Sequence, residues 1–453
     1  MARERKVRVF FCEQCGTESP RWQGRCSGCG AWNSMAEAPA SSARGQGPWL
    51  APSNEGAKSV AEIPLEEGPR LSVSFGEMNR VLGGGLVSGS VVLMAGDPGI
   101  GKSTLLLQAA AGVGQGDKVL YATGEESAQQ VKLRARRLGA EGSNLLILQE
   151  SDIERILQCL EEVRPRLVVV DSIQAVESSE IQSSAGTVGQ VRECAGILIR
   201  WAKARGAPML LAGHVTKEGD VAGPRLLEHM VDVVLYLEGE PSSGLRVLRA
   251  VKNRFGPTNE VAFFSMGEGG LKEVLDPSSL FLSHRREGVP GSVIVPLMEG
   301  SRPLVVEVQA LVMPSQLPSP RRTVTGLDPN RVAMICAVLW RHGGLPLGTH
   351  DVAVNVAGGY RVYDAAADLA AAVALASSLR NVPMADGAAA LGELGLTGEV
   401  RPVPRLEERL RELSRLGLRR ALVPAGAEVR GGSVQIVPVS TLREALRWAL
   451  GSD

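Results

Sequence analysis

The sequence predicts an α/β protein: a mainly parallel, twisted sheet with helices on both faces, preceded by a small cysteine knuckle and followed by an α+β domain. Three observations predict it. Short apolar runs alternate with amphipathic stretches from about residue 91 to residue 237, as parallel strands joined by crossover helices do. A glycine-rich turn follows the first of these runs, and four cysteines lie in two C-x-x-C pairs near the N-terminus.

The apolar runs define the expected strands and the amphipathic stretches the expected helices. Strands are expected at Val91–Ala95, Val119–Thr123, Leu145–Leu148, Leu167–Val170, Met209–Ala212 and Val233–Leu237. Helices are expected at Ala128–Leu138, Ile153–Val163 and Val188–Ala204. Carboxyl ends of parallel strands meet at one edge of a sheet, so side chains that follow these strands are expected to gather there.

Length and composition bound the possibilities. At 453 residues the chain is expected to hold about three domains. Its 49 basic and 49 acidic residues balance, so a nucleic-acid surface must be local. No apolar run approaches the ~20 residues of a membrane helix, and the basic first residues lack the apolar core of a secretory signal. We therefore expect a cytoplasmic protein without a membrane partner.

The paired cysteines predict a structural metal site. Each pair is followed by glycine, which lets the backbone turn so that four thiolates converge on one ion. A closed four-thiolate set is typical of structural Zn²⁺, and it can equally hold iron as in rubredoxin. The expected ligands are Cys12, Cys15, Cys26 and Cys29.

Composition shifts suggest four segments. We expect a four-cysteine zinc finger at 1–35, a flexible Ala/Ser/Pro/Gly-rich linker at 36–60, a nucleotide-binding core at 61–276, and a separate domain at 277–453.

The glycine-rich turn matches G-x-x-x-x-G-K-[ST] between a strand and a helix, which is the context that this motif needs. Its backbone N–H groups can cradle phosphates, Lys102 can reach the β- and γ-phosphates, and Ser103 can hold Mg²⁺. The sequence therefore predicts an ATP-type nucleotide site. Its expected residues are Gly96, Asp97, Pro98, Gly99, Ile100, Gly101, Lys102, Ser103 and Thr104.

Two carboxylates are expected at the same edge. Asp171 ends an apolar strand and can take Mg²⁺, directly or through water. Glu125 follows the strand Val119–Thr123 and can orient a water for attack on the γ-phosphate. The alternative for Glu125 and Glu126 is an acidic pair that favours a helix N-terminus.

Further polar residues follow later strands. His214 can sense a γ-phosphate, or be structural. The glycine-rich segments 178–189 and 217–225 are expected not to pack, to be mobile and to face a polymer, with Lys217 and Arg225 contacting DNA. Lys252 and Arg254 stand at i and i+2 of an extended segment, as in a phosphate clamp or a solvated strand end.

Together these motifs resemble the RadA (Sms) family of bacterial DNA-repair proteins over essentially the whole chain. The motor domain is also similar to RecA-type recombinases and ring-forming helicases, so the core is expected to be RecA-like. The resemblance implies that Glu125 is the hydrolytic carboxylate, Asp171 the magnesium-side acid and His214 the γ-phosphate sensor. It rests on segments 12–29, 96–103, 124–127 and 213–219, and on the family motif Lys252, Asn253, Arg254, Phe255 and Gly256.

The same resemblance implies an assembly and a substrate. Lys252 and Arg254 match a motif that recombinases insert across a subunit interface onto the neighbour's ATP, which gives them a catalytic role in trans. A homo-hexameric ring is implied, acting with a strand-exchange recombinase on single-stranded and branched DNA and promoting branch migration.

From about Pro290 onward the chain resembles the proteolytic domain of Lon, which uses a serine activated by a lysine. Those positions fall at Ala366 and Glu407, which cannot do that chemistry. We therefore expect a non-proteolytic scaffold. The arginines of Arg401–Arg420 can line a phosphate path, or form a salt-bridged helix face with the interspersed glutamates.

Three functions follow from these expectations. The first is an ATP-driven DNA motor of recombinational repair. The second is an ATP-dependent protease or protein remodeller, and the third is an ATP-binding switch with slow turnover.

Overall fold

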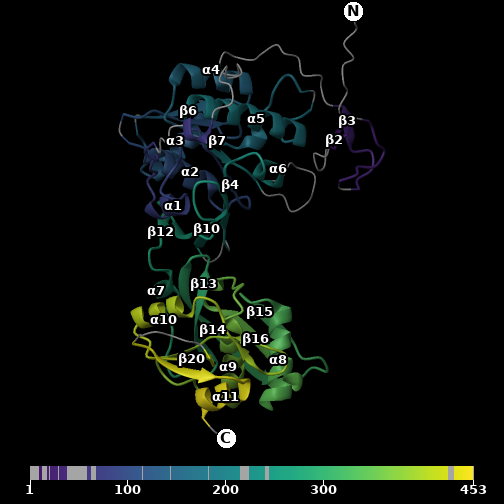
Figure 1. The fold of residues 1–453 in the computed structure, drawn as a ribbon, viewed down its shortest axis with the longest axis vertical. Helices are drawn as coiled ribbons and strands as arrows, with labels where there is room; N and C mark the ends of the chain where they lie inside the picture. The colour runs from purple at the N-terminus through teal and green to yellow at the C-terminus, as the bar shows by residue number, and fades with distance from the viewer. Residues whose placement is uncertain are drawn as a thin grey trace, which may run out of the picture. The chain divides into compact units, whose positions relative to one another are not determined.

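The computed structural model describes residues 10–12, 18–19, 21–28, 30–37, 59–62, 68–114, 116–142, 144–181, 183–214, 224–239, 244–426 and 433–451, without the side chains of residues 11, 18, 224 and 225. The chain divides into two compact units, Met1–Glu273 and Val274–Asp453. Figure 1 shows both, with the first unit in purple to teal and the second in green to yellow. Most of the expected linker 36–60 lies outside the described residues.

The first unit begins with a small antiparallel sheet of order β2-β1-β3. Its strands are β1 (Phe10–Cys12), β2 (Glu18–Ser19) and β3 (Met35–Glu37). Cys12, Cys26 and Met35 are buried together with Phe10 packed against them, a core far too small to hold a fold without a cross-link or a metal.

A nine-stranded sheet forms the body of the first unit, in the order β12-β11-β10-β9-β4-β8-β7-β5-β6. The six strands from β9 to β6 are parallel, as predicted, and the other three pair antiparallel. The parallel strands are β4 (Val91–Ala95), β5 (Val119–Thr123), β6 (Leu145–Gln149), β7 (Leu167–Asp171), β8 (Met209–Ala212) and β9 (Val233–Glu238). The antiparallel strands are β10 (Leu245–Asn253), β11 (Val261–Gly267) and β12 (Gly270–Glu273).

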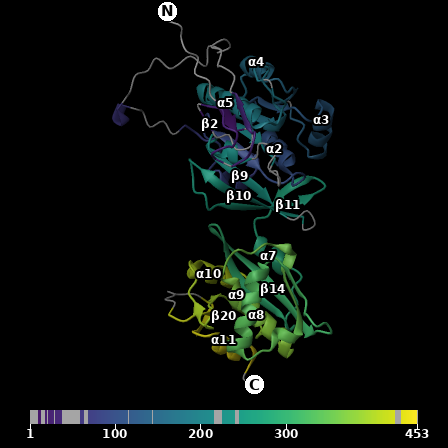
Figure 2. The same cartoon turned by 90° about the vertical axis from the view of Figure 1, so that its right-hand side faces the viewer.

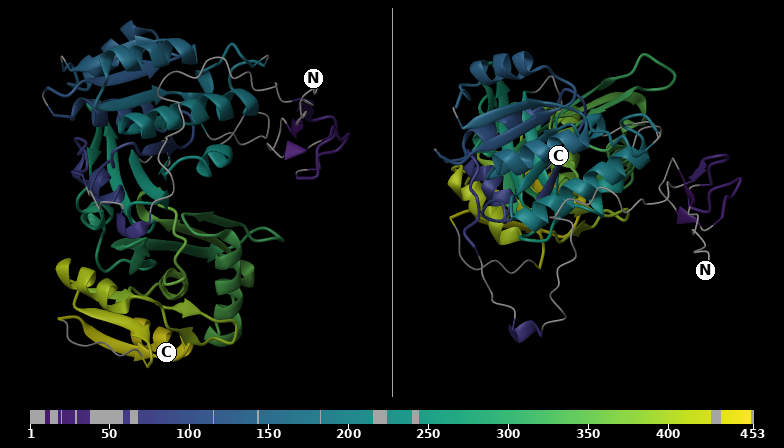
Figure 3. Two further views of the ribbon diagram at one scale, coloured as in Figure 1. Left: turned by 45° about the horizontal axis from the view of Figure 1, so that its top comes forward. Right: turned by 90° about the horizontal axis from the view of Figure 1, so that it is seen from above.

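Helices cover both faces of this sheet because its central strands are apolar on both sides. Val92 and Met94 of β4 face one core and Val91 and Leu93 face the other. Helices α1 to α3 pack in the first core and α4 to α6 in the second, which Figure 3 shows from two directions. These helices are α1 (Gly76–Val81), α2 (Lys102–Ala111), α3 (Ala128–Arg137), α4 (Ile153–Val163), α5 (Val188–Arg205) and α6 (Pro224–Glu228). Short 3-10 helices are η2 (Val60–Glu62) and η3 (Ile173–Ala175).

Local sequence sets the ends of the predicted helices. Ser127 and Gln130 form a reciprocal capping box at the start of α3. Asp152 caps α4 by accepting from the backbone N–H groups of Glu154 and Arg155. These caps fix where α3 and α4 begin, a few residues after β5 and β6 end.

The second unit is an α+β domain with a seven-stranded sheet of order β15-β16-β14-β13-β17-β20-β21 and a small β18-β19 pair. Helix α9 packs against β13 and β14, with α8 and α11 against α9 (Figure 2). The strands are β13 (Ser292–Glu299), β14 (Arg302–Pro314), β15 (Arg322–Thr325), β16 (His350–Val356), β17 (Ala388–Ala390), β18 (Glu393–Leu394), β19 (Val400–Arg401), β20 (Arg420–Pro424) and β21 (Gln435–Val439). The helices are α7 (Pro277–Leu282), α8 (Pro329–Gly343), α9 (Ala367–Arg380), α10 (Leu406–Arg415) and α11 (Leu442–Leu450), with the 3-10 helices η5 (Leu347–Thr349) and η6 (Ala357–Gly359).

Among the helices described, none combines the length and the apolar character that crossing a membrane would need.

Candidate active site

The glycine-rich turn joins β4 to α2 as a tight backbone loop. Gly96, Gly99 and Gly101 all have positive φ angles, of 152°, 76° and 116°. A Cβ on Gly96 would collide with the carbonyl oxygen of Leu237, and one on Gly101 would lie 2.6 Å from Met266 Cε. Only glycine fits at these two positions, which leaves the inner backbone open to a phosphate.

Two contacts that the sequence did not predict hold this loop from behind. Arg246 on β10 is 4% exposed, and its Nε donates to the carbonyl oxygen of Ile100 at 3.0 Å. Gln108 on α2 exchanges two hydrogen bonds with Leu271 of β12. The antiparallel strands therefore brace both the loop and the helix that it starts.

Lys102 is the first residue of α2 and is 4% exposed. Its Nζ donates to the carbonyl oxygens of Gly96 at 2.8 Å and Asp97 at 3.0 Å, inside the loop. Burial lowers the pKa of Lys102, and the carboxylates of Asp171, Asp97 and Glu125 oppose that shift. The ammonium thus lies where a phosphate can replace weak neutral acceptors.

Ser103 and Thr104 follow in the first turn of α2, half-buried. Asp171 ends β7 at the same sheet edge and is 8% exposed. Tyr121 of β5, which the sequence analysis missed, donates its hydroxyl to Asp171 Oδ2. Burial and then Asp171 raise the pKa of Tyr121 well above its ordinary value, so it stays a donor and fixes the carboxylate.

Glu125 follows β5 and its side chain is 51% exposed. It accepts a hydrogen bond from Ser172 Oγ at 2.5 Å, and His214 Nε2 lies 3.7 Å from the same oxygen, Oε1. His214 is the largest cause of a pKa lowered to about 2, with Ser172 and Lys102 contributing in the same direction. The structure therefore brings Lys102, Asp171, Glu125 and His214 to one edge.

Glu126, next to Glu125, points to a different partner. Its carboxylate pairs with Arg134 of α3, and its N–H donates to Thr123 Oγ1 at 3.1 Å. Glu126 thus has the helix-terminal structural role that was the alternative for this pair.

A buried side-chain amide without a described hydrogen-bond partner lies near the segment that carries His214. Gln174 of η3 is 9% exposed, and within the described residues neither of its amide atoms has a hydrogen-bond partner. His214 Nδ1 is likewise buried and unpartnered there. A Cβ added to Gly213 would lie 3.8 Å from Gln174 Nε2, which places Gln174 next to the chain segment that carries His214.

The expectation that 178–189 does not pack is wrong for several of its residues. Gln190 of α5 accepts from the N–H of Ser178 at 2.8 Å and donates to the carbonyl oxygens of Ser178, Ile181 and Ser183. One buried glutamine side chain supplies the hydrogen bonds that a sheet or helix would otherwise provide, and composition alone does not reveal this.

Lys252 and Arg254 lie at the other edge of the sheet, away from their own phosphate loop. Near the end of β10 Asn253 pairs with Val233, the first residue of β9, so this is the amino edge of the parallel strands. Lys252 Nζ donates to the carbonyl oxygens of Glu228 at 2.6 Å and Val231 at 2.9 Å. Burial, and then the neighbouring charge of Arg254, lower the pKa of Lys252.

Arg254 is 53% exposed and its Nη1 lies 3.1 Å from Asp232 Oδ1. Asp232 is buried and also accepts, through Oδ2, from the N–H of Val91 at 3.1 Å. Arg254 is therefore anchored at one end of its guanidinium, to an acid that holds the first residue of β4.

The rest of the family motif is structural. Asn253 Oδ1 accepts from the N–H of Phe255 at 2.9 Å, which sets a turn. A Cβ on Gly256 would lie 3.0 Å from Gly83 Cα, so the motif packs backbone to backbone against the triple glycine before β4. Arg70 bridges the carbonyl oxygens of Gly83 and Phe255.

For the cysteine cluster, the structure describes Cys12 and Cys26, while Cys15 and Cys29 lie outside the described residues. Both described thiols are buried, and the N–H of Gly28 donates to Cys26 Sγ at 3.3 Å. An N–H donor to sulfur stabilises a thiolate, so the donor chemistry fits a metal ligand.

Two other predictions also fall largely outside the description. Lys217 is not described, and for Arg225 only the backbone is, in the first turn of α6.

In the second unit, Ala366 is fully buried and Glu407 is paired with Arg411 at 3.2 Å. Most arginines of 401–420 have acidic partners, as in Arg401–Glu399, Arg405–Glu408 and Arg415–Asp276. The salt-bridged alternative is confirmed for these residues, and the phosphate path stays a prediction.

Comparison with known proteins agrees with this layout. Family models match an AAA domain at residues 66–220, a rubredoxin metal binding domain at 10–37 and subunit ChlI of Mg-chelatase at 331–427. The chain is 51% identical over 445 residues to the DNA repair protein RadA of Pseudomonas aeruginosa, covering 97% of this chain and 98% of that protein. It is 49% identical to RadA of Bacillus subtilis, covering 98% of both, and 48% identical to RadA of Escherichia coli, covering 97% of both.

Since this identity extends over nearly the full length of each relative, the chain belongs to the RadA family of DNA repair proteins.

Proposed function

We propose that the chain is a DNA-dependent ATPase of recombinational repair, which processes or branch-migrates intermediates on single-stranded and branched DNA. The observation that carries this proposal is Glu125, held by Ser172 and His214 at the sheet edge that also bears Lys102 and Asp171. A carboxylate in this position can orient a water molecule. The DNA part of the proposal rests on membership of a family of DNA repair proteins.

The position of each residue suggests its role. The backbone of 96–101 and the start of α2, with Lys102, would hold ATP, and Ser103 and Asp171 would hold Mg²⁺. Mg²⁺ supplies charge neutralisation on the phosphates when bound. Glu125 orients the attacking water, and His214 reports on the γ-phosphate.

The pKa of Glu125 suggests how hydrolysis is gated. At about 2 the carboxylate is ionised but a weak base. If His214 turns toward a phosphate, its contact with Glu125 is lost, the pKa of Glu125 rises and the carboxylate becomes a stronger base. Glu125 would then become the stronger base only after the triphosphate is bound.

Lys252 and Arg254 lie at the edge opposite their own phosphate loop, so a contact with nucleotide would have to be made to that of another copy. This supports a catalytic role in trans within a homo-hexameric ring. We further propose that Lys217 and Arg225 contact DNA, and that a strand-exchange recombinase is a partner.

For the remaining parts we propose a Zn²⁺ site of Cys12, Cys15, Cys26 and Cys29, a finger at 1–35, a linker at 36–60, a core at 61–276 and a Lon-like scaffold at 277–453. Free thiolates require a reducing compartment, so cytoplasmic residence is proposed. Ala366 and Glu407 argue against proteolysis of the Lon type, since alanine offers no nucleophile and glutamate replaces the lysine that would activate a serine.

The test is the ATPase rate with and without single-stranded DNA. We expect stimulation by DNA, and a loss of roughly 10²–10³-fold in the Lys102→Ala variant, because a preorganised phosphate contact is removed. Lys132→Ala, an exposed lysine of α3, is the matched control and should behave as wild type. An ATPase rate that does not change with DNA would favour the alternative of an ATP-binding switch. Cleavage of casein by the wild type that is lost in Lys102→Ala would favour the alternative of an ATP-dependent protease.

A further inference from the structure

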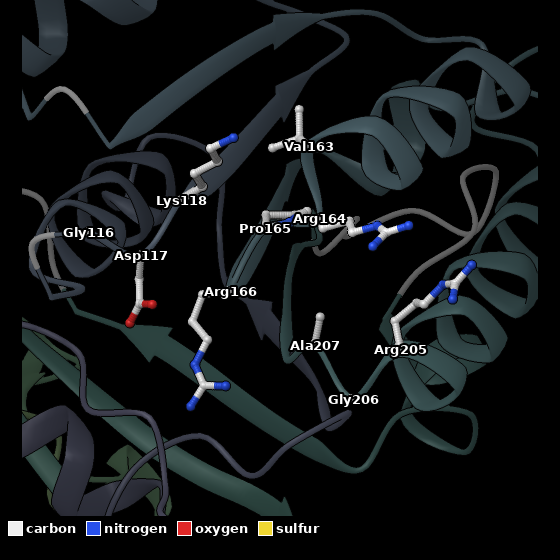
Figure 4. A pocket seen from close by; sticks show the side chains of 10 residues that line it. All are labelled: Gly116, Asp117, Lys118, Val163, Arg164, Pro165, Arg166, Arg205, Gly206 and Ala207. Carbon is white, nitrogen blue, oxygen red and sulfur yellow. The ribbon is translucent and has the colours of Figure 1, made fainter.

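A basic hollow of about 400 Å³ lies at the amino ends of β5, β7 and β8. We define it by its four cationic side chains, Lys118, Arg164, Arg166 and Arg205. Figure 4 shows them coming from separate segments around Pro165 and Ala207. Phosphate loop and basic hollow are at opposite edges of the sheet, since the loop follows the carboxyl end of β4.

The fold places two of these cations next to each other. Lys118 immediately precedes β5 and Arg166 immediately precedes β7, and the two strands pair with Val119 opposite Leu167. The N–H of Arg166 donates to the carbonyl oxygen of Lys118 at 2.7 Å. This hydrogen bond extends the pairing of β5 and β7 by one residue, so the backbone that carries the side chains of Lys118 and Arg166 is held in place.

The other two cations end helices. Arg164 follows α4 in a left-handed conformation with φ of 48°, and its N–H donates to Leu160 at 3.0 Å. Arg205 is the last residue of α5. Cations at helix C-termini are favoured by the helix dipole, which accounts for Arg164 and Arg205. It does not account for Lys118 and Arg166, which precede strands.

The charges in the hollow are not balanced. Arg205 pairs with Glu161, with Nη2 and Oε2 2.5 Å apart. The side chains of Lys118, Arg164 and Arg166 are exposed and have no hydrogen-bond or ion-pair partner among the residues that the structure describes, although the charge of Arg164 also helps to lower the pKa of Glu161. Asp117 is the one carboxylate among the lining residues. Four cations line the hollow, with Asp117 in the lining and Glu161 beside it, so the net charge is positive and favours a bound anion.

We infer that the basic hollow binds phosphate groups of a nucleic acid strand, at a site separate from ATP. Lysine and arginine forks suit phosphate oxygens, and the lining contains no aromatic side chain on which a base would stack. Contact is therefore with the backbone and independent of sequence. This goes beyond the proposed function, because the amino edge takes no part in the chain's own ATP hydrolysis.

The test uses the full chain, with its phosphate loop filled by Mg²⁺ and a non-hydrolysable ATP analogue. Binding of a labelled 30-residue oligo-dT is measured by anisotropy across salt concentrations for the wild type and for Lys118→Ala/Arg166→Ala. Each lost phosphate contact should reduce the slope of log K against log salt by roughly 0.7 on a single strand, so about 1.4 in total. At 0.1 M salt that corresponds to about 25-fold weaker binding.

The matched control is Lys132→Ala/Arg136→Ala, which removes the same charge from exposed positions of α3 and should keep the wild-type slope. A second measurement needs no variant: oligo-dT should slow acylation of Lys118 by an amine reagent, read by mass spectrometry, and leave Lys132 unchanged. Equal slopes in both double variants, or Lys118 unprotected by DNA, would overturn the inference.

Two further arms separate other occupants. Protection of Lys118 by inorganic tripolyphosphate and not by oligo-dT would assign the hollow to free polyphosphate and reject the strand. Loss of assembly in Lys118→Ala/Arg166→Ala by light scattering, with DNA affinity unchanged, would assign it to an acidic surface of a second copy.

Discussion

Two clusters of polar and ionisable side chains in this chain differ in how many of their groups have hydrogen-bond partners. At the carboxyl edge of the nine-stranded sheet, Glu125 is half exposed, Gln174 is buried without a described partner, and His214 contacts Glu125 only at 3.7 Å. In the C-terminal unit, Arg409 is 1% exposed and its donors reach Asp364 at 2.6 Å and the carbonyl oxygens of Pro296 and Pro404. Asp364 in turn accepts from the N–H groups of Met298 and Ala366.

The difference teaches what each cluster is built for. The hydrogen bonds of Arg409 Nε and Nη1 tie it to Asp364 and to two carbonyl oxygens, and Asp364 fixes the backbone at Ala366, where the Lon pattern has its serine. Around Glu125, hydrogen-bonding groups without partners lower the stability of the fold, but they remain available to a substrate. The first cluster should respond to mutation in stability and the second in rate.

The largest expected effect is on rate. Glu125→Gln keeps the shape of the side chain but removes the carboxylate, so ATP should still bind while kcat falls by roughly 10²–10⁴-fold. Single-turnover hydrolysis and nucleotide binding by fluorescence measure the two parts. Glu126→Gln is the control, because Glu126 is paired with Arg134 and is expected to keep the turnover rate. Equal loss of binding in Glu125→Gln would indicate a structural role.

Next is the stability of the C-terminal unit. Arg409→Ala removes a buried guanidinium and leaves Asp364, whose side chain is 16% exposed, without its charge partner, which should lower the free energy of unfolding by about 3–5 kcal/mol. Arg411→Ala on the same helix removes an arginine that is 73% exposed and should leave the unfolding midpoint unchanged. Denaturant unfolding followed by far-UV circular dichroism compares them. A basal ATPase rate lost in Arg409→Ala, at a temperature where it is folded, would refute the separation of the two clusters.

A smaller effect is expected at Gln174. Replacing an unpaired buried amide with a similar apolar side chain, Gln174→Leu, should raise the free energy of unfolding by about 1–3 kcal/mol. If the amide pairs with the segment around His214 during turnover, the same variant should lose stimulation by DNA. Greater stability with unchanged stimulation would show that Gln174 has no part in coupling. Gln190→Leu, which breaks five described hydrogen bonds, should instead destabilise the protein.

The smallest effect is the pH dependence of Glu125. Its folded pKa of about 2 is below the ordinary 4.5, so its contribution to stability is complete above pH 4.5 and is lost as the pH falls toward 2. His214→Ala removes the main cause and should return the pKa toward 4.5. The gap in urea midpoint between wild type and variant should therefore shrink as the pH falls through this range. A gap that is independent of pH would contradict the assignment.

Sequence predicted the strands of the parallel sheet and the groups delivered by their carboxyl ends, because both follow from local apolar runs and the motif at 96–103. The sequence did not reveal the roles of Arg246, Gln108 and Tyr121. Each of them contacts a partner that only the pairing of the strands brings near, as Arg246 contacts Ile100. The antiparallel strands β11 and β12 were missed as well, because only tertiary pairing sets them against β10.

Asp232 has a mechanical consequence. Its two carboxylate oxygens connect Arg254, at the surface, to the N–H of Val91, where β4 begins. In the ring proposed above, a contact of a neighbouring subunit with Arg254 would reach, through Asp232, the first residue of the strand that leads into the phosphate loop.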